Sequence, residues 1–274
     1  MDADLIQTKF EKLGARATIR PLVPNRWRPA PGPVMIDIGH DRHGEFFDIQ
    51  AGDDADVEVL DVQPRDRHLL LMVRRAADRP HQPDTKDKFL CGHDERHWFV
   101  AGVPDGASVS SVVTAKEALK PDLVRRREQG KRGKRKKRLR RKTDVFVRQG
   151  EWFFIPSPGV RVNEKLILSN EPITRGRGGK PHLCEQLYRR GGTTVYVCRQ
   201  YTNGLTTDEY RTLLKANPDA AKWGWRTMAR NPVVYVRGKV WHPDHATIRL
   251  DVWHRVEMNT ENRSRAMASV AFLD

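Results

Sequence analysis

The sequence is poor in cysteine, with three residues in a chain of 274. They stand far apart, at Cys91, Cys184 and Cys198. A disulfide framework needs a denser and even-numbered set of cysteines, and such frameworks belong mainly to small secreted domains. We therefore predict free thiols and a reducing, cytoplasmic compartment.

Long apolar runs are also absent. The uncharged apolar runs, such as His68–Val73 and Trp98–Ala101, fall far short of the roughly 18 to 20 apolar residues that a membrane span needs. The first residues, Met1–Ile6, carry two acids where a secretory signal has positive charge followed by an apolar stretch. We expect no contact with a membrane and no signal peptide.

Two catalytic signatures are missing as well. No GxSxG nucleophile elbow occurs, and no glycine-rich stretch has the spacing of a P-loop. The segment Thr174–Lys180 is nevertheless rich in glycine and cations. Because glycine lets the backbone approach a phosphate closely, Arg175, Arg177 and Lys180 are candidates for phosphate contact.

Positive charge is what the chain has in excess, and it is concentrated. The formal net charge is +15, and residues 125–142 alone hold 13 basic residues and one acid. A run this dense repels itself unless it is solvated or contacts a polyanion. Neutralised phosphates release counterions, so such a run binds nucleic acid with an affinity that falls steeply with salt.

We predict that this polybasic segment, residues 125–142, is an arm that binds nucleic acid; the alternative is a solvated linker or a localisation tract. Its candidate contact residues are Arg125, Arg126, Arg127, Lys131, Arg132, Lys134, Arg135, Lys136, Lys137, Arg138, Arg140, Arg141 and Lys142. Residues 1–62 are acidic, with 7 basic and 12 acidic side chains. They could contact this segment or a protein partner, which makes a scaffold a further alternative.

The region 143–274 adds a net charge of +7 and interleaves Arg and Lys with Tyr and Trp. That composition suits phosphate contacts combined with stacking on unpaired bases, which favours RNA over DNA. A capping box at Thr206–Glu209 predicts a helix, and Asn217–Pro218 predicts a second helix over 220–230. The pair has the form of a weak helix-turn-helix.

The hydrophobic pattern predicts an α+β fold. Short β-branched and aromatic runs separated by turn residues favour antiparallel hairpins or a meander in two halves, with a few short helices and the central polybasic segment. We divide the chain into a β-rich region with a leading helix (1–104), a helix and polybasic arm (105–142) and a basic α+β region (143–274). The leading helix spans residues 2–13 and ends at Gly14.

Two hairpins are similar in sequence. Lys88–Pro104 resembles Val145–Pro156, with three fewer residues in the predicted turn of the second. They stand on either side of the polybasic segment and have no third copy, so a solenoid is excluded and two related halves are favoured.

Histidine clusters suggest a divalent metal ion. The most site-like cluster comprises His242, Asp244 and His245 at a predicted turn, with His254 on the strand that follows. Imidazole and carboxylate are common ligands of zinc, manganese and iron, and a bound ion can turn water into a nucleophile. A weaker set is Cys91, His93 and His97, which lacks a second CxxC or CxxH pair. The alternative for each cluster is a solvated turn.

These observations support three functions. The first is nucleic-acid binding through the polybasic segment and the basic carboxy-terminal region. The second is a metal-dependent nuclease or other phosphoesterase whose candidate catalytic residues are His242, Asp244, His245 and His254. The third is the scaffold.

Overall fold

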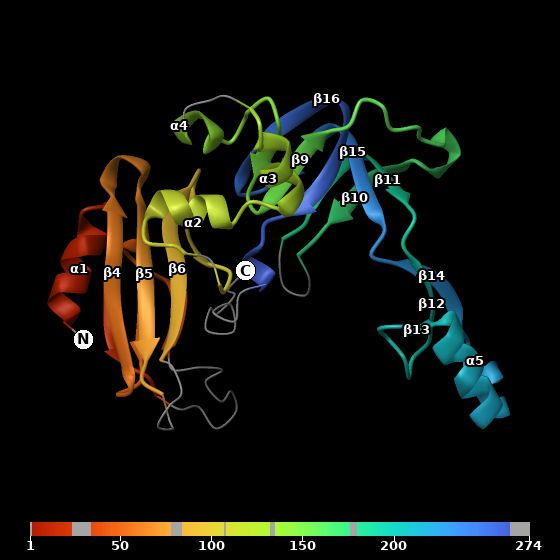
Figure 1. Ribbon diagram of the computed structural model, residues 1–274, viewed down its shortest axis with the longest axis horizontal. Helices are drawn as coiled ribbons and strands as arrows, with labels where there is room; N and C mark the ends of the chain where they lie inside the picture. Colours follow the sequence, from red (N-terminus) through yellow and green to blue (C-terminus); the bar gives the residue numbers. More distant parts are fainter. Residues whose placement is uncertain are drawn as a thin grey trace.

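The computed structural model describes residues 2–23, 34–77, 84–106, 108–131, 135–175 and 180–263. Antiparallel sheets dominate and the helices are short, which confirms the predicted α+β class. Two β-rich halves are joined by α2 (Val112–Ala118), α3 (Asp122–Glu128) and α4 (Arg135–Arg138) (Figure 1). No helix in the described ranges is long and apolar enough to cross a membrane.

The amino-terminal half packs one helix and two small sheets around an apolar core. Its elements are α1 (Ala3–Glu11), β1 (Ala17–Pro21), β2 (Val34–Asp41), β3 (Gly44–Ala51), β4 (Ala55–Gln63), β5 (His68–Arg75), β6 (Thr85–Asp94) and β7 (His97–Gly102). Strands β1, β3 and β2 form one sheet, and β4 to β7 form a meander. The ring of Phe47 lies 4.7 Å from Phe10 and 5.4 Å from Trp98, so α1 and both sheets share one core.

The predicted leading helix is confirmed as α1. The Asp2 carboxylate accepts a hydrogen bond from the backbone N–H of Leu5, and Gly14 leaves the helical path with a φ of +73°. Ile6 and Phe10 are the buried residues of the helix, as its apolar spacing predicts. The short β-branched and aromatic runs of residues 34–75 form the strands β2 to β5.

The carboxy-terminal half is built on a six-stranded antiparallel sheet. In spatial order its strands are β10 (Leu168–Ile173), β11 (His182–Arg190), β15 (Val233–His242), β16 (His245–Met258), β9 (Trp152–Pro156) and β8 (Val147–Gln149). Phe154, Leu187 and Val236 are fully buried in its core. The β8–β9 hairpin folds back over the β15–β16 hairpin, where the Gln149 amide donates to the Ala246 carbonyl at 2.7 Å.

The similar hairpins are β6–β7 and β8–β9, and the predicted difference in turn length is wrong. Asp94 pairs with His97 in the first and Gln149 pairs with Trp152 in the second, so each loop has two residues. The hairpins differ in the length of their strands instead.

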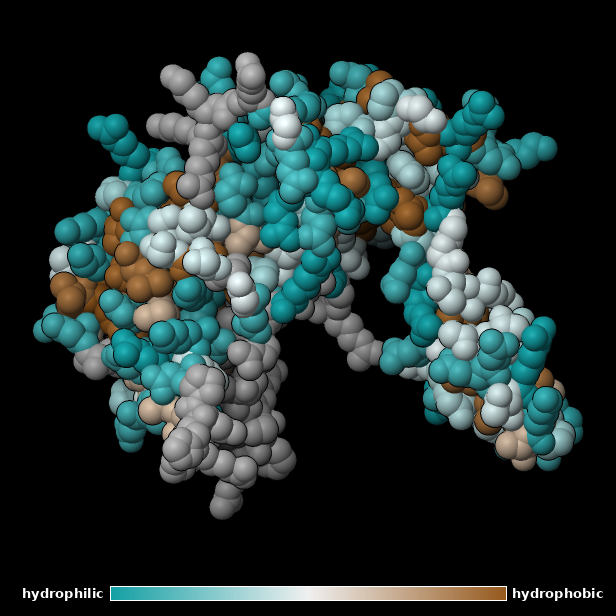
Figure 2. All heavy atoms as spheres, in the orientation of Figure 1, coloured by the Kyte–Doolittle hydropathy of each residue, from teal (hydrophilic) through white to brown (hydrophobic). Residues whose placement is uncertain are grey.

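A small lobe projects from this sheet. It comprises β12 (Thr193–Val197), β13 (Leu205–Thr206), α5 (Thr207–Ala216), a 3-10 helix η3 (Pro218–Lys222) and β14 (Arg226–Arg230). Figure 2 shows it standing apart from the rest of the molecule with a mostly hydrophilic surface. The capping box between Thr206 and Glu209 is confirmed.

The predicted helix over 220–230 is wrong, and with it the helix-turn-helix. Gly224, with a φ of +66°, ends the helical path after η3, and Arg226–Arg230 then pairs with β12 as a strand. The indole N–H of Trp225 donates to the Ala220 carbonyl at 2.7 Å, which holds the two parts of the segment together. Tertiary pairing with β12 has therefore overridden the local helical signal.

The helices between the halves contact both of them. Helix α2 buries Val112 and Ala115 against the meander, whereas α3 buries Val124 against Phe146 and Phe153 of the carboxy-terminal half. Lys120, between the two helices, is buried and pairs with Glu128 at 2.8 Å. The division at residues 104 and 142 stays a prediction.

Candidate metal centre between the two halves

Three histidines form a row across three adjacent strands of the carboxy-terminal sheet. Leu183 pairs with Trp241, which places His182 of β11 opposite His242 of β15, and His242 pairs with His245 of β16. One ring nitrogen from each histidine lies within 4.8 Å of the others. A tetrahedral ion with bonds of about 2.1 Å holds its ligand atoms roughly 3.4 Å apart, so small side-chain movements would close the site.

His182 is the most unusual member of this histidine row. It is 2% exposed, and neither of its ring nitrogens has a hydrogen-bond partner among the described residues. A buried polar group without a partner costs free energy, on the order of 1 to 3 kcal/mol. Coordination of a metal ion would satisfy one of these nitrogens.

His242 is held in place by the backbone. The N–H of Asp244 donates to Nδ1 at 3.1 Å, and Nε2 lies 3.2 Å from the Lys180 carbonyl. These contacts fix the proton of the neutral ring on Nε2. To bind an ion through Nε2, His242 must exchange the Lys180 carbonyl for the metal.

Gly150 leaves room beside the row. It lies in the β8–β9 loop with a φ of +55°, and a Cβ atom there would lie 2.8 Å from Nε2 of His245 and 3.5 Å from Nε2 of His182. Glycine is therefore required twice, once for the left-handed backbone and once for the close approach to the two imidazoles.

His245 has a carboxylate behind it. Its Nδ1 lies 3.7 Å from Oε2 of Glu95, and Glu95 also accepts hydrogen bonds from the Ala246 N–H and from the Arg141 guanidinium. A histidine that binds metal through one nitrogen commonly has a carboxylate near the other, which orients the ring. This network connects the polybasic segment to the histidine row.

Burial favours the neutral form of two members of the row. Burial, followed by the neighbouring imidazoles of His242 and His245, lowers the pKa of His182 to about 3. Burial likewise lowers the pKa of His245. Both rings are therefore uncharged at neutral pH, the state in which imidazole binds metal ions.

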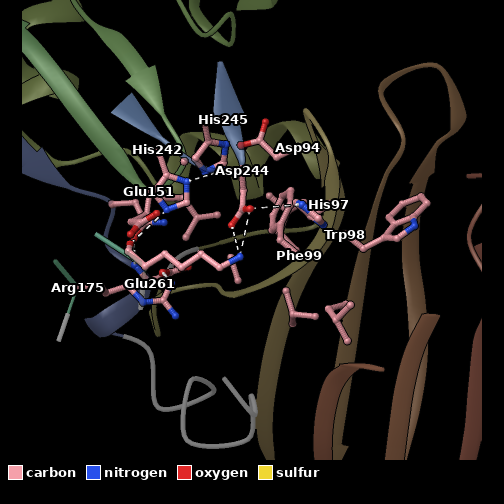
Figure 3. A pocket seen from close by; sticks show the side chains of 18 of the residues that line it. Asp94, His97, Trp98, Phe99, Glu151, Arg175, His242, Asp244, His245 and Glu261 are labelled. Atoms are coloured by element: carbon pink, nitrogen blue, oxygen red, sulfur yellow. Dashed lines mark hydrogen bonds and ion pairs between the residues drawn. The ribbon is translucent and has the colours of Figure 1, made fainter. Parts of the chain in front are cut away.

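Two members of the row, His242 and His245, line a pocket of about 640 Å³ between the two halves, whereas the buried His182 is not among its lining residues (Figure 3). The Asp244 carboxylate accepts a hydrogen bond from Lys180 at 3.0 Å and lies 3.7 Å from His97, which is held by Glu45 at 2.6 Å. The remaining charged lining comprises three cations and four carboxylates: Lys116, Arg148, Arg175, Asp37, Asp94, Glu151 and Glu261. The pocket thus places carboxylates and cations around the histidine row.

The predicted site residues are only partly brought together. His242, Asp244 and His245 line the pocket, but His254 does not. It is opposite Val236, six residues along β15 from His242, a separation of roughly 20 Å at about 3.3 Å per residue. Its Nδ1 lies 2.7 Å from the Val252 carbonyl instead.

The weaker set does not converge as a ligand group either. Cys91 is fully buried in the amino-terminal core, where burial raises the pKa of its thiol above the usual range. His93 packs edge-on against Trp98, with ring centroids 4.9 Å apart. His97 lines the pocket but is bound to Glu45. Among the described residues, the histidine row is the single group with metal-ligand spacing.

Sequence reasoning missed His182. It stands alone in Lys180–Cys184, outside any histidine cluster, and it joins His242 only through pairing of strands about sixty residues apart. The one available signal was its position at the start of a strand directly after a glycine-rich loop.

The polybasic segment is in part packed against the protein. Arg141 forms ion pairs with Asp94 and Glu95, Arg125 pairs with Asp122, and the Arg127 guanidinium donates to the Pro156 carbonyl at 2.7 Å. The exposed cations include Arg126, Lys131, Lys137, Arg140 and Lys142. Arg132, Lys134 and Arg177 lie outside the described residues, as do the side chains of Arg135 and Lys136.

Arg175 and Lys180, the other candidates from the glycine-rich segment Thr174–Lys180, line the pocket between the halves. Arg175 pairs with Glu261 at 2.5 Å, and Lys180 pairs with Asp244.

Comparison with protein families, with curated proteins and with solved structures finds no match for this chain. The chemistry of the site therefore has to be argued from its own residues.

Proposed function

We propose that the protein is a metal-dependent hydrolase that cleaves phosphodiester bonds of nucleic acid. The observation that carries the proposal is the histidine row, in which a buried imidazole without a hydrogen-bond partner in the described part of the chain lies beside two imidazoles that line a pocket. Three protein ligands with an open fourth position are typical of catalytic rather than structural zinc-type sites.

The surroundings of the row suit hydrolysis. A divalent ion lowers the pKa of a bound water towards about 7, and a nearby carboxylate can then accept its proton. Asp244 and Glu151 supply carboxylates to the pocket. Lys180 and Arg175 supply positive charge for the negative charge that develops on a phosphoryl group.

The choice of nucleic acid as substrate rests on charge. A net charge of +15 with a polybasic segment favours a polyanion, and the aromatic residues of the carboxy-terminal region favour unpaired RNA over DNA. The three cysteines are free, which supports a cytoplasmic location.

Metal analysis tests the first half of the proposal. The purified protein, dialysed against Zn²⁺ or Mn²⁺ and then against buffer, should retain about one ion per chain. His182→Ala should retain less than about a tenth of that. The matched control is His254→Gln, which removes another buried histidine of the same sheet and should keep the ion. A wild-type protein that holds no divalent ion would exclude the site.

A cleavage assay tests the second half. Fluorescently labelled single-stranded RNA and DNA should be cut by the wild type and by His254→Gln, and not by His182→Ala or by protein treated with a chelator. Cleavage that survives in His182→Ala would indicate a contaminating nuclease or another active site.

Binding without cleavage is the second candidate function, and the polybasic segment favours it. Protein that binds RNA with a steep salt dependence, carries no ion and cuts nothing would be a nucleic-acid-binding protein whose histidine row is structural.

A further inference from the structure

A second pocket, of about 950 Å³, lies next to the first, and most of its charged lining residues are cations. Its walls come from the β4–β5 connection, α2, the end of the polybasic segment and β8. The charged lining residues are Arg65, Lys116, Lys120, Arg138, Arg140, Arg141 and Arg148, against Asp66 and Asp94. This basic pocket therefore has seven cationic side chains and two carboxylates.

The carboxylates near the basic pocket are already engaged. Asp94 is shared by Arg141 and Arg148, Asp66 lies 3.5 Å from Lys116, and Lys120 uses the buried Glu128. Arg65 and Arg140 are exposed at the rim of the pocket. The lining thus retains a surplus of positive charge after its ion pairs are formed.

Arg148 shows that the compensation is incomplete. Its side chain is 29% exposed, its Nη2 lies 3.2 Å from Asp94, and its Nε is buried with no hydrogen-bond partner in the described part of the chain. Burial lowers the pKa of Arg148. The exposed part of this guanidinium lines the pocket, and arginine is a common ligand of phosphate in such positions.

The basic pocket is continuous with the histidine pocket. Asp94, Lys116, Arg148 and Phe153 line both. Arg148 is also two residues from Gly150, which touches the histidine row. A chain of phosphates in the basic pocket would therefore lead directly to the histidines.

We propose that the basic pocket binds the phosphate groups of a nucleic-acid single strand next to the phosphodiester presented to the histidine row. This inference rests on the proposed function, because it assigns the substrate path of that site. It also gives a role to Arg65, Lys116 and Arg148, which lie outside the polybasic segment.

The dimensions and the charge favour one strand over other phosphate compounds. A volume of about 950 Å³ is at the upper end of pockets for small ligands, so it admits a few nucleotides of one strand but not a duplex, whose major groove alone is about 12 Å wide. The polybasic segment continues from the pocket with further cations, which an isolated nucleotide would not reach.

The test compares two double variants of equal charge. Arg65→Gln with Arg140→Gln removes two exposed arginines from the basic pocket. Arg161→Gln with Arg199→Gln removes two exposed arginines that line neither pocket. Binding of a labelled 12-nucleotide RNA is measured with metal-free protein over a range of salt concentrations, so that the result does not depend on catalysis.

We expect the log–log salt slope to become shallower by about 1.4 for the pocket pair, at about 0.7 per phosphate contact on a single strand, and to change by less than about 0.3 for the control pair. Equal slopes for the two pairs would overturn the proposal, because any surface charge would then serve. A nucleoside monophosphate that binds as tightly as the 12-mer would also overturn it, since the ligand would be a small phosphate compound.

Metal content and cleavage separate this inference from the function it rests on. The pocket pair should retain the ion and show a raised KM on RNA with a nearly unchanged kcat. Loss of the expected slope change in a protein that still cuts RNA would refute the basic pocket alone. A slope change in a protein that neither binds metal nor cuts RNA would refute the hydrolase and leave the phosphate-binding pocket standing.

Discussion

The two similar hairpins, β6–β7 and β8–β9, contact each other where the two halves of the molecule meet. Their loops use different residues for the same left-handed backbone conformation. The first loop residue has a positive φ in both, +50° for Glu95 in β6–β7 and +55° for Gly150 in β8–β9. Glycine adopts this conformation without cost, whereas a residue with a Cβ loses roughly 1 to 2 kcal/mol. The β6–β7 loop therefore has a strained residue, Glu95, whereas the β8–β9 loop has an unstrained Gly150.

The difference follows from what each loop faces. The Glu95 side chain accepts hydrogen bonds from Arg141 and Ala246 and stands behind His245, so its carboxylate is used by the site. Gly150 faces the imidazoles, where a side chain would collide. Glu95 thus has a strained backbone at a position where its carboxylate has hydrogen-bond partners. Gly150 stands where a Cβ atom would collide with the imidazoles of the row.

The largest effect on the histidine row and its metal content should come from Gly150→Ala. The new Cβ would occupy the space beside Nε2 of His245 and would also strain the backbone. We expect the metal content to fall below about a tenth of the wild-type value and the midpoint of thermal unfolding to fall by about 4 °C, from roughly 1 to 2 kcal/mol of strain. Metal analysis and a thermal melt measure the two effects.

Gly191→Ala is the matched control for this substitution. Gly191 has a φ of +68°, and a Cβ there would have no atom of the described residues within 4 Å. It should show the same loss of thermal stability and keep the ion. If both variants keep the ion, Gly150 provides only its backbone conformation and the space beside the row is not used.

The next largest effect should come from Asp94→Asn, which breaks the contact between the hairpins. Asp94 is 14% exposed and accepts from Arg141 and Arg148, so the substitution removes the carboxylate that both guanidinium groups share. We expect a loss of about 2 kcal/mol, below the range for a fully buried pair, measured by denaturant unfolding. Asp251→Asn removes an exposed carboxylate near Arg249 and should change stability by less than about 0.5 kcal/mol. Equal losses would show that the hairpins do not depend on this contact.

Much of the fold could be predicted from the sequence because it is local. The strands coincide with short runs of β-branched and aromatic residues between turns, and Asp2 and Thr206 cap α1 and α5 with their side chains. The failure at 220–230 has a physical reason. A strand at the edge of a small lobe needs little burial pattern of its own, because pairing with β12 decides its conformation.

Only the part of the site that lies in the β15–β16 hairpin could be predicted from the sequence. His242, Asp244 and His245 share a two-residue turn, so their proximity follows from local sequence. The prediction that His254 joins this group was wrong, because the residue lies far along β16 from the turn and each residue of a strand adds about 3.3 Å. His182, Gly150 and Glu95 come from other strands and loops, and only the register between strands brings them together.

A smaller effect is expected from Glu95→Gln. The amide retains an oxygen for the Ala246 N–H but loses the charge that faces Nδ1 of His245. We expect metal affinity to fall by about tenfold, the lower end of the range for residues behind a metal ligand, as measured by competition with a chelator. Glu45→Gln is the control, because Glu45 holds His97 and not the row. An equal loss in the control would mean that any pocket carboxylate acts on the ion through its charge.

The smallest effect should come from Arg96→Ala, the second residue of the β6–β7 loop. The exposed Arg96 guanidinium donates to the carbonyl of Pro243, in the turn between His242 and His245, at 3.1 Å. Because water replaces an exposed hydrogen bond readily, we expect a loss of less than about 0.5 kcal/mol and an unchanged metal content. If metal affinity fell as far as in Glu95→Gln, the position of the histidine turn would depend on this contact. The hairpin would then act on the site through both of its loop residues, and the Glu95 carboxylate would share its role with the Arg96 guanidinium.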